Sequence, residues 1–189
     1  YFLFTLLFAF SIQSQVIITE IADPNNDSQA RFIELTNIGD NAFDLTGYQL
    51  VRWTNANTAY TTSSAVDLSE FGSLQSKGIL TLANNTNFEA VYGVAPTKVI
   101  GSTGPADSNG DDNIAILDPN GSIYDVYGVP GTDGTGQPHE FEDGRAERKG
   151  SVTAPSSTWD LNEWNIDNDA GAGDGALDCL LYTSDAADD

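Results

Sequence analysis

Three short runs, in which polar residues interrupt β-branched or other large apolar residues, most strongly constrain what this chain can fold into. The runs are 16–21 (VIITEI), 31–37 (RFIELTN) and 48–53 (YQLVRW). β-Branched and aromatic residues interrupted by polar ones are typical of strands that bury one face. The cluster 37–41 (NIGDN) favours a turn, because glycine accepts positive φ and Asn or Asp can bond the adjacent backbone. The stretch therefore predicts three strands of an antiparallel sheet.

The remainder of the chain predicts further short strands and little helix. Strand patterns recur at 79–83 (ILTLA), 113–117 and 122–127, and the turn residues DPNG join the last two as a hairpin. A short helix is predicted at 88–93, ending in a glycine. Loops are predicted at 54–64 with an edge strand near Tyr60, at 128–138 and at 151–157, with a polar segment at 141–149. Together these patterns predict an all-β sandwich of seven or eight short strands with one short helix.

The two ends of the chain differ in character from the body. Residues 1–10 are almost entirely apolar, a length that suits the core of a signal peptide and is too short to span a membrane. The chain contains no Met and no basic segment precedes this run, so 1–15 is interpreted as a truncated signal peptide. Residues 179–189 resemble a translated sequencing-adapter tail of non-native origin. One domain is therefore expected at 16–178.

Charge and cysteine content exclude several classes of function. The chain has 7 Lys and Arg against 28 Asp and Glu, a formal net charge of −21. Nucleic-acid binders present basic surfaces, so no nucleic-acid partner is expected. The single cysteine, Cys179, lies in the adapter-like tail, which leaves no disulfide, zinc–thiolate site or cysteine nucleophile to propose.

Two loops carry the oxygen ligands that calcium prefers. Their candidate ligands are Asp107, Asn109, Asp111, Asp112, Asp167, Asp169 and Asp174. Ca²⁺ takes six to eight hard oxygen ligands, so clustered Asp and Asn side chains are of the right type. An EF-hand is excluded, because Asp112 stands where that loop needs glycine and 114–117 is a strand. The alternative interpretation is a pair of solvated turns, which favour the same residues.

No motif for catalysis stands out. His139 lies beside Glu140, Glu142 and Asp143, yet no second histidine accompanies it, and neither a G-x-S-x-G nor a P-loop sequence occurs. Four aromatic residues are candidates for a sugar-binding platform: Trp53, Tyr60, Trp159 and Trp164. Burial in the core is the favoured alternative for Trp53, which ends a strand.

The order of motifs in 16–53 resembles the opening of the lamin tail domain family. The residues that carry the resemblance are 18–21 (ITEI), 32–37 (FIELTN) and 44–50 (DLTGYQL), followed by Leu74-x-x-x-Gly78-x-Leu80-x-Leu82. The resemblance implies an immunoglobulin-like antiparallel β-sandwich and brings no catalytic residues. Members of this family occur in nuclear lamins and as modules of secreted bacterial proteins, beside hydrolases or surface-sorting segments.

We therefore expect a non-enzymatic binding module of a longer protein, secreted by a bacterium and located outside the cell or at its surface. The expected partner is a protein or a cell-surface polymer, and the oligomeric state is left open. Two alternatives remain. One is the accessory domain of a secreted nuclease or phosphatase whose catalytic part lies elsewhere, and the other is a calcium-dependent adhesive or carbohydrate-binding module.

Overall fold

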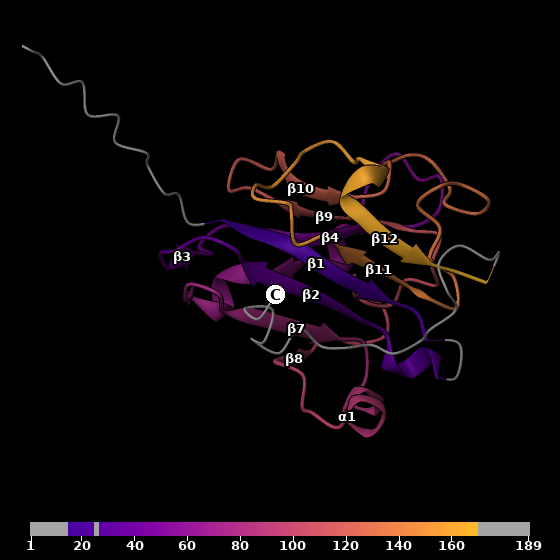
Figure 1. Ribbon diagram of the computed structural model, residues 1–189, viewed down its shortest axis with the longest axis horizontal. Helices are drawn as coiled ribbons and strands as arrows, with labels where there is room; N and C mark the ends of the chain where they lie inside the picture. The colour runs from indigo at the N-terminus through magenta and orange to yellow at the C-terminus, as the bar shows by residue number, and fades with distance from the viewer. Residues whose placement is uncertain (1–14, 25–26, 170–189) are drawn as a thin grey trace, which may run out of the picture.

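The structure, a computed structural model, describes residues 15–24 and 27–169 and consists mainly of β-strands. A six-stranded sheet has the order β12-β11-β1-β2-β7-β8. Its strands are β1 (Val16–Ala22), β2 (Phe32–Asn37), β7 (Ile79–Ala83), β8 (Lys98–Val99), β11 (Arg145–Arg148) and β12 (Trp164–Asp167). Figure 1 shows this sheet crossing the molecule, with the helix beyond β7 and β8.

A second sheet has the order β10-β9-β4-β5. Its strands are β4 (Gln49–Trp53), β5 (Val66–Asp67), β9 (Asn113–Leu117) and β10 (Ile123–Tyr127). A small third sheet pairs β3 (Phe43–Asp44) with β6 (Ser73–Leu74). The helical elements of the described residues are α1 (Asn87–Tyr92) and the 3-10 turns η1 (Ser28–Ala30), η2 (Thr62–Ser64), η3 (Leu68–Phe71) and η4 (Leu161–Glu163).

The main core lies between the two larger sheets. Ile18 and Leu35 come from the six-stranded sheet, and Leu50, Ile116 and Tyr127 come from the four-stranded sheet. All five are fully buried or nearly so. Two sheets that bury their inner faces against each other in this way form a β-sandwich. The predicted all-β sandwich is confirmed.

A β-bulge in β1 explains its sequence pattern. The pairing of β1 with β2 shifts register between Ile18 and Glu20, so Thr19 is the extra residue. Ile18 and Ile21 both join the main core, whereas Thr19 donates a hydrogen bond to Glu34 on the opposite face. The bulge thus places two successive polar residues, Thr19 and Glu20, on the outer face of the six-stranded sheet.

The short helix α1 covers part of that outer face. Phe88 is fully buried, and its ring contacts Phe32 of β2 edge-on at 5.2 Å between centroids. Tyr92 contacts both rings. Gly93 follows the helix in the left-handed conformation, with φ at 74°, as the sequence predicts. Helices this short depend on such packing, because the isolated helix is not stable.

The count of strands agrees with the expectation only after the short ones are set aside. The described residues hold twelve strands, of which β3, β5, β6 and β8 have two residues each. The eight longer strands include β11 and β12, which the sequence pattern does not indicate. The segment that contains β11 reads as merely polar because Arg148 faces inward, where it is only 3% exposed.

The pair β7 and β8 is parallel, whereas the other strand pairs of the described residues are antiparallel. The prediction of an edge strand near Tyr60 is wrong, since that residue lies in a loop against Trp53. Residues 1–14 and 179–189, which carry the signal-peptide and tail predictions, lie outside the described residues.

Candidate functional site

The first predicted calcium loop is held by ion pairs to the body of the sandwich. Asp112 is 1% exposed and pairs with Arg52 of β4 at 3.0 Å, while its other oxygen accepts the Asn55 backbone N–H at 2.9 Å. Burial raises the pKa of Asp112, and Arg52 opposes that shift. Both carboxylate oxygens already have donors, so Asp112 serves to anchor the loop.

The side chains of Asp107 and Asn109 have different neighbours from the side chain of Asp112. The Asp107 carboxylate accepts a hydrogen bond from Asn84 at 3.2 Å and lies 3.5 Å from Arg31. Its carbonyl accepts a short hydrogen bond from Arg52. Asn109 is exposed at the tip of the loop. The alternating oxygens that resemble a calcium loop in the sequence therefore do not face one centre.

Asp111 differs from these residues in having a free oxygen. It is 6% exposed, and one carboxylate oxygen accepts from Asn55 Nδ2 at 2.9 Å. The other oxygen, Oδ1, is buried and has no hydrogen-bond partner. A buried acceptor without a partner is rare, because its desolvation is not compensated.

The structure brings the second predicted loop to the same region. The Asp169 backbone N–H donates to the Glu142 carbonyl at 2.9 Å, and Phe141 donates to the carbonyl of Gly110 at 2.9 Å. Burial raises the pKa of Glu142, and the charges of Asp169, Glu140, Asp111 and Asp143 raise it further. Phe141 and Glu142 thus link the two loops, and the sequence suggests Glu142 only as a neighbour of His139.

The remaining members of the second loop have other roles or lie elsewhere. Asp167 is buried in β12 opposite Arg145 of β11. Asp174 lies outside the described residues. In the described ranges, no group of three or more His, Cys, Asp or Glu side chains is arranged to hold a metal ion. A calcium site at Asp111 and Asp169 stays a prediction.

His139 is a buried residue of the core rim. It is 2% exposed, its ring lies edge-on to Trp159 at 5.4 Å, and its carbonyl accepts the Tyr127 hydroxyl at 2.8 Å. Its Nε2 atom is buried without a hydrogen-bond partner, and burial lowers the pKa of the imidazole. The neutral, packed ring is what burial without a partner favours.

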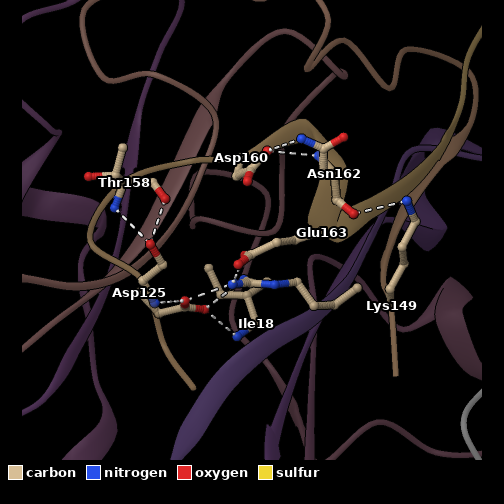
Figure 2. Close-up of polar contacts among 9 residues, drawn as sticks. Ile18, Asp125, Lys149, Thr158, Asp160, Asn162 and Glu163 are labelled. Carbon is tan, nitrogen blue, oxygen red and sulfur yellow. Dashed lines mark hydrogen bonds and ion pairs between the residues drawn. The ribbon is translucent and has the colours of Figure 1, made fainter. Parts of the chain in front are cut away.

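A buried polar network joins the two sheets at Asp125 of β10. Asp125 is fully buried and accepts hydrogen bonds from the backbone of Ile18 at 2.8 Å and of Ser156 at 2.9 Å. Arg148 of β11 donates to both of its carboxylate oxygens at 3.3 Å. Figure 2 shows Asp125 beside Ile18, with Glu163 approaching from the other side.

Arg148 completes this network. It donates to Glu163 at 2.6 Å, and its guanidinium lies 4.7 Å from the centre of the Trp164 ring. Burial raises the pKa of Asp125, and the charge of Arg148 opposes the shift. The network therefore connects β1, β10, β11 and η4, and its role is to stabilise the fold. Sequence reasoning missed it because its members lie 15 to 107 residues apart.

The four candidate aromatic residues do not form an exposed platform. Trp53 and Trp164 are 6% and 3% exposed, and Trp159 and Tyr60 are half-buried. Tyr60 lies edge-on to Trp53 at 5.5 Å. The core interpretation of Trp53 is confirmed, because sheet-face packing buries its ring.

Comparison with known families identifies the fold. Among the described residues, no helix combines the length and the apolar character that a membrane crossing requires. No curated protein matches the chain. The family model described as Lamin Tail Domain matches residues 11–131, which include all of the strands from β1 to β10. Its members share the immunoglobulin-like β-sandwich seen here, and the chain therefore belongs to the lamin tail domain family.

Proposed function

We propose that this chain is a non-catalytic interaction module of a longer protein located outside the cell or at its surface. The observation that carries the proposal is membership of the lamin tail domain family, whose immunoglobulin-like modules serve interaction. The partner class is a protein or a cell-surface polymer. A net charge of −21 favours partners with basic surfaces and disfavours phosphate backbones.

Binding is tested with the full chain carrying a fluorescent label. The probes are insoluble cell-wall preparations, insoluble polysaccharides and basic proteins, each at low and high salt. We expect saturable retention by one class, weakened by salt if basic groups provide the contact. Absence of retention by every class would contradict the proposal.

A separate experiment distinguishes the proposed module from an accessory domain of a hydrolase. Sequencing an intact, homologous reading frame beyond residue 178 shows which segment accompanies the module. A surface-sorting segment there supports the proposal. A nuclease or phosphatase domain there replaces the proposed function with the accessory role.

Export from the cell is proposed from the apolar run at 1–10. The test is a fusion of an initiating Met, two Lys and residues 1–24 to a reporter phosphatase that is active only after export. We expect activity in the fusion and none when Leu6→Asp and Leu7→Asp interrupt the apolar run. Equal activity of the two fusions would exclude a signal peptide.

A calcium-dependent form of the interaction is a second candidate, favoured by the free Oδ1 atom of Asp111 beside Glu142 and Asp169. A cation there would relieve the repulsion of these carboxylates. If Ca²⁺ binds only the folded state, a hundredfold excess over Kd adds about 2.7 kcal/mol to the free energy of unfolding. The measurement compares thermal midpoints in calcium and in chelator at equal ionic strength.

The control separates binding from charge screening. We expect the calcium-specific rise to disappear in Asp111→Asn and to persist in Asp40→Asn, which alters an exposed acidic residue of the loop between β2 and β3. Identical midpoints of the unchanged chain in calcium and in chelator would leave these loops as solvated turns.

A further inference from the structure

Three glutamates form a row across adjacent strands on the outer face of the six-stranded sheet. This glutamate row consists of Glu34 on β2, Glu20 on β1 and Glu147 on β11. The pairing register places Glu20 directly opposite both of the others. Residues directly opposite on one face have Cβ atoms about 4.5–5.5 Å apart, and like charges there destabilise the sheet.

The central carboxyl group of the row is buried and has no hydrogen-bond partner. Glu20 is 0% exposed, and neither of its carboxyl oxygens has a partner. Glu34 is 1% exposed; its Oε1 accepts the Thr19 hydroxyl at 2.7 Å, and its Oε2 is also without a partner. An ionised carboxylate in such a site is strongly disfavoured, because nothing replaces the water that it has lost.

The charges around Glu20 do not compensate it. Glu34 faces it from β2, and Glu147 and Arg145 face it from β11. Arg145 is the one cation of this group, and it lies 3.3 Å from the carboxylate of Glu147. The row ends in uncharged residues, Thr81 of β7 opposite Glu34 and Asn165 of β12 opposite Glu147, according to the register.

We propose that the glutamate row is a proton-binding site, in which the folded domain holds Glu20 as a neutral carboxylic acid and the sheet is strengthened by acid. The bulge at Thr19 builds the site, because it turns Thr19 and Glu20 to the same face. Thr19 then supplies a hydroxyl to Glu34 and none to Glu20. The neutral acid removes one of the three like charges from the row.

The direction of the pH dependence follows from the folded-state titration. Burial, followed by the charges of Glu34 and Glu147, raises the pKa of Glu20 well above its ordinary value of 4.5. Burial likewise raises the pKa of Glu34. The folded chain therefore keeps a proton that the unfolded chain releases above 4.5. The stability that this proton provides is complete below that pH and is lost as the pH rises through the folded-state pKa.

The first test is urea unfolding of the full chain between about pH 5 and about pH 8. For each proton that only the folded state holds, the unfolding equilibrium constant increases by up to about tenfold for every unit by which the pH is raised. Glu20→Gln keeps the shape of the side chain and cannot titrate. We expect this variant to unfold at a higher urea concentration than the unchanged chain near pH 8. We also expect its free energy of unfolding to depend less steeply on pH, by the equivalent of one proton. Glu89→Gln, an exposed residue of α1, is the matched control and should leave the slope unchanged.

The second test observes the carboxyl group itself. In the carbon NMR spectrum of the full chain labelled at glutamate side chains, we expect one carboxyl signal that titrates well above 4.5 and is missing in Glu20→Gln. A Glu20 signal that titrates near the ordinary value would overturn the proposal. So would an unchanged pH slope in Glu20→Gln, or a variant that fails to fold near pH 8.

Discussion

At the scale of single residues, burial decides how each charge behaves. Asp125 and Arg148 are both buried and compensate each other's charge, and Asp125 also accepts hydrogen bonds from two backbone N–H groups. Glu20 is equally buried but faces two like charges. The same side-chain chemistry therefore produces a structural ion pair at one place and a proton site at another, according to the neighbours.

Replacement of Arg148 by Met tests the buried pair. Arg148→Met leaves the Asp125 carboxylate buried without its counter-ion, and we expect the free energy of unfolding to fall by about 3–5 kcal/mol. Lys98→Met is the contrasting variant, because Lys98 pairs with Glu70 where both side chains are about two-fifths exposed. A surface pair contributes about 0–1 kcal/mol. Urea melts near neutral pH measure both, and equal losses would contradict a structural role for Arg148.

At the scale of elements, short pieces of structure persist because their ends and faces have partners. The two-turn helix α1 has no side-chain cap bond at its beginning. It is held instead by Phe88 against Phe32 and by the left-handed Gly93 at its end, whose N–H donates to the Glu89 carbonyl. The glycine matters because other L-residues are strained at positive φ.

Gly93→Ala isolates the contribution of that backbone conformation. A Cβ atom at Gly93 would meet nothing within 4 Å, so strain at φ 74° is the only change. We expect the variant to lose about 1–2 kcal/mol of folding free energy. Gly150 is equally open and does not have a left-handed φ, so Gly150→Ala should be neutral or slightly stabilising. Thermal melts that rank the two alike would refute the strain argument.

At the scale of the whole molecule, the sandwich extends beyond the stretch that matches the family. The matched residues end at 131, yet β11 pairs with β1 and β12 pairs with β11. Ala146 and Trp164 of these strands are part of the main core. The later strands thus cover the edge of β1, which would otherwise present unpaired backbone groups.

A pair of chain lengths tests this extension. We expect residues 16–178 to fold as one cooperative unit, and residues 16–131 to lack a cooperative melt. The shorter chain loses Arg148, which leaves Asp125 buried without its counter-ion, and it loses Trp164 from the core. Circular dichroism and thermal melts measure both. A cooperative melt of the shorter chain would show that β11 and β12 are dispensable.

The charge of the whole molecule predicts its behaviour toward nucleic acid. Because the net charge is −21, we expect the chain not to retard duplex DNA in a mobility-shift assay at low salt, where the attraction of basic groups to phosphates is strongest. Arg145 lies beside Glu147, and Arg148 is buried against Asp125 and Glu163, so neither is offered to solvent as a basic patch. Clear binding without divalent ions would contradict this expectation.

The sequence by itself determined the strands with regular patterns and the family. The mixture of β-branched, aromatic and polar residues in 16–21, 31–37 and 48–53 indicates strands, and the left-handed residue after α1 favours glycine, so both can be predicted from neighbouring residues. Aspartate-rich loops were equally visible, but composition does not say which way a carboxylate points.

The tertiary structure alone decided where the charges meet. Asp125 bonds to Ile18, which lies 107 residues away in the sequence. Strand β11 pairs with β1 although three of its four residues are charged, and a one-residue bulge places Glu20 opposite Glu34. These contacts depend on strand order and register, because a shift of one residue reverses the face to which a side chain points. Because the packing of the whole sandwich fixes the register, no local sequence pattern predicts the ion pair or the glutamate row.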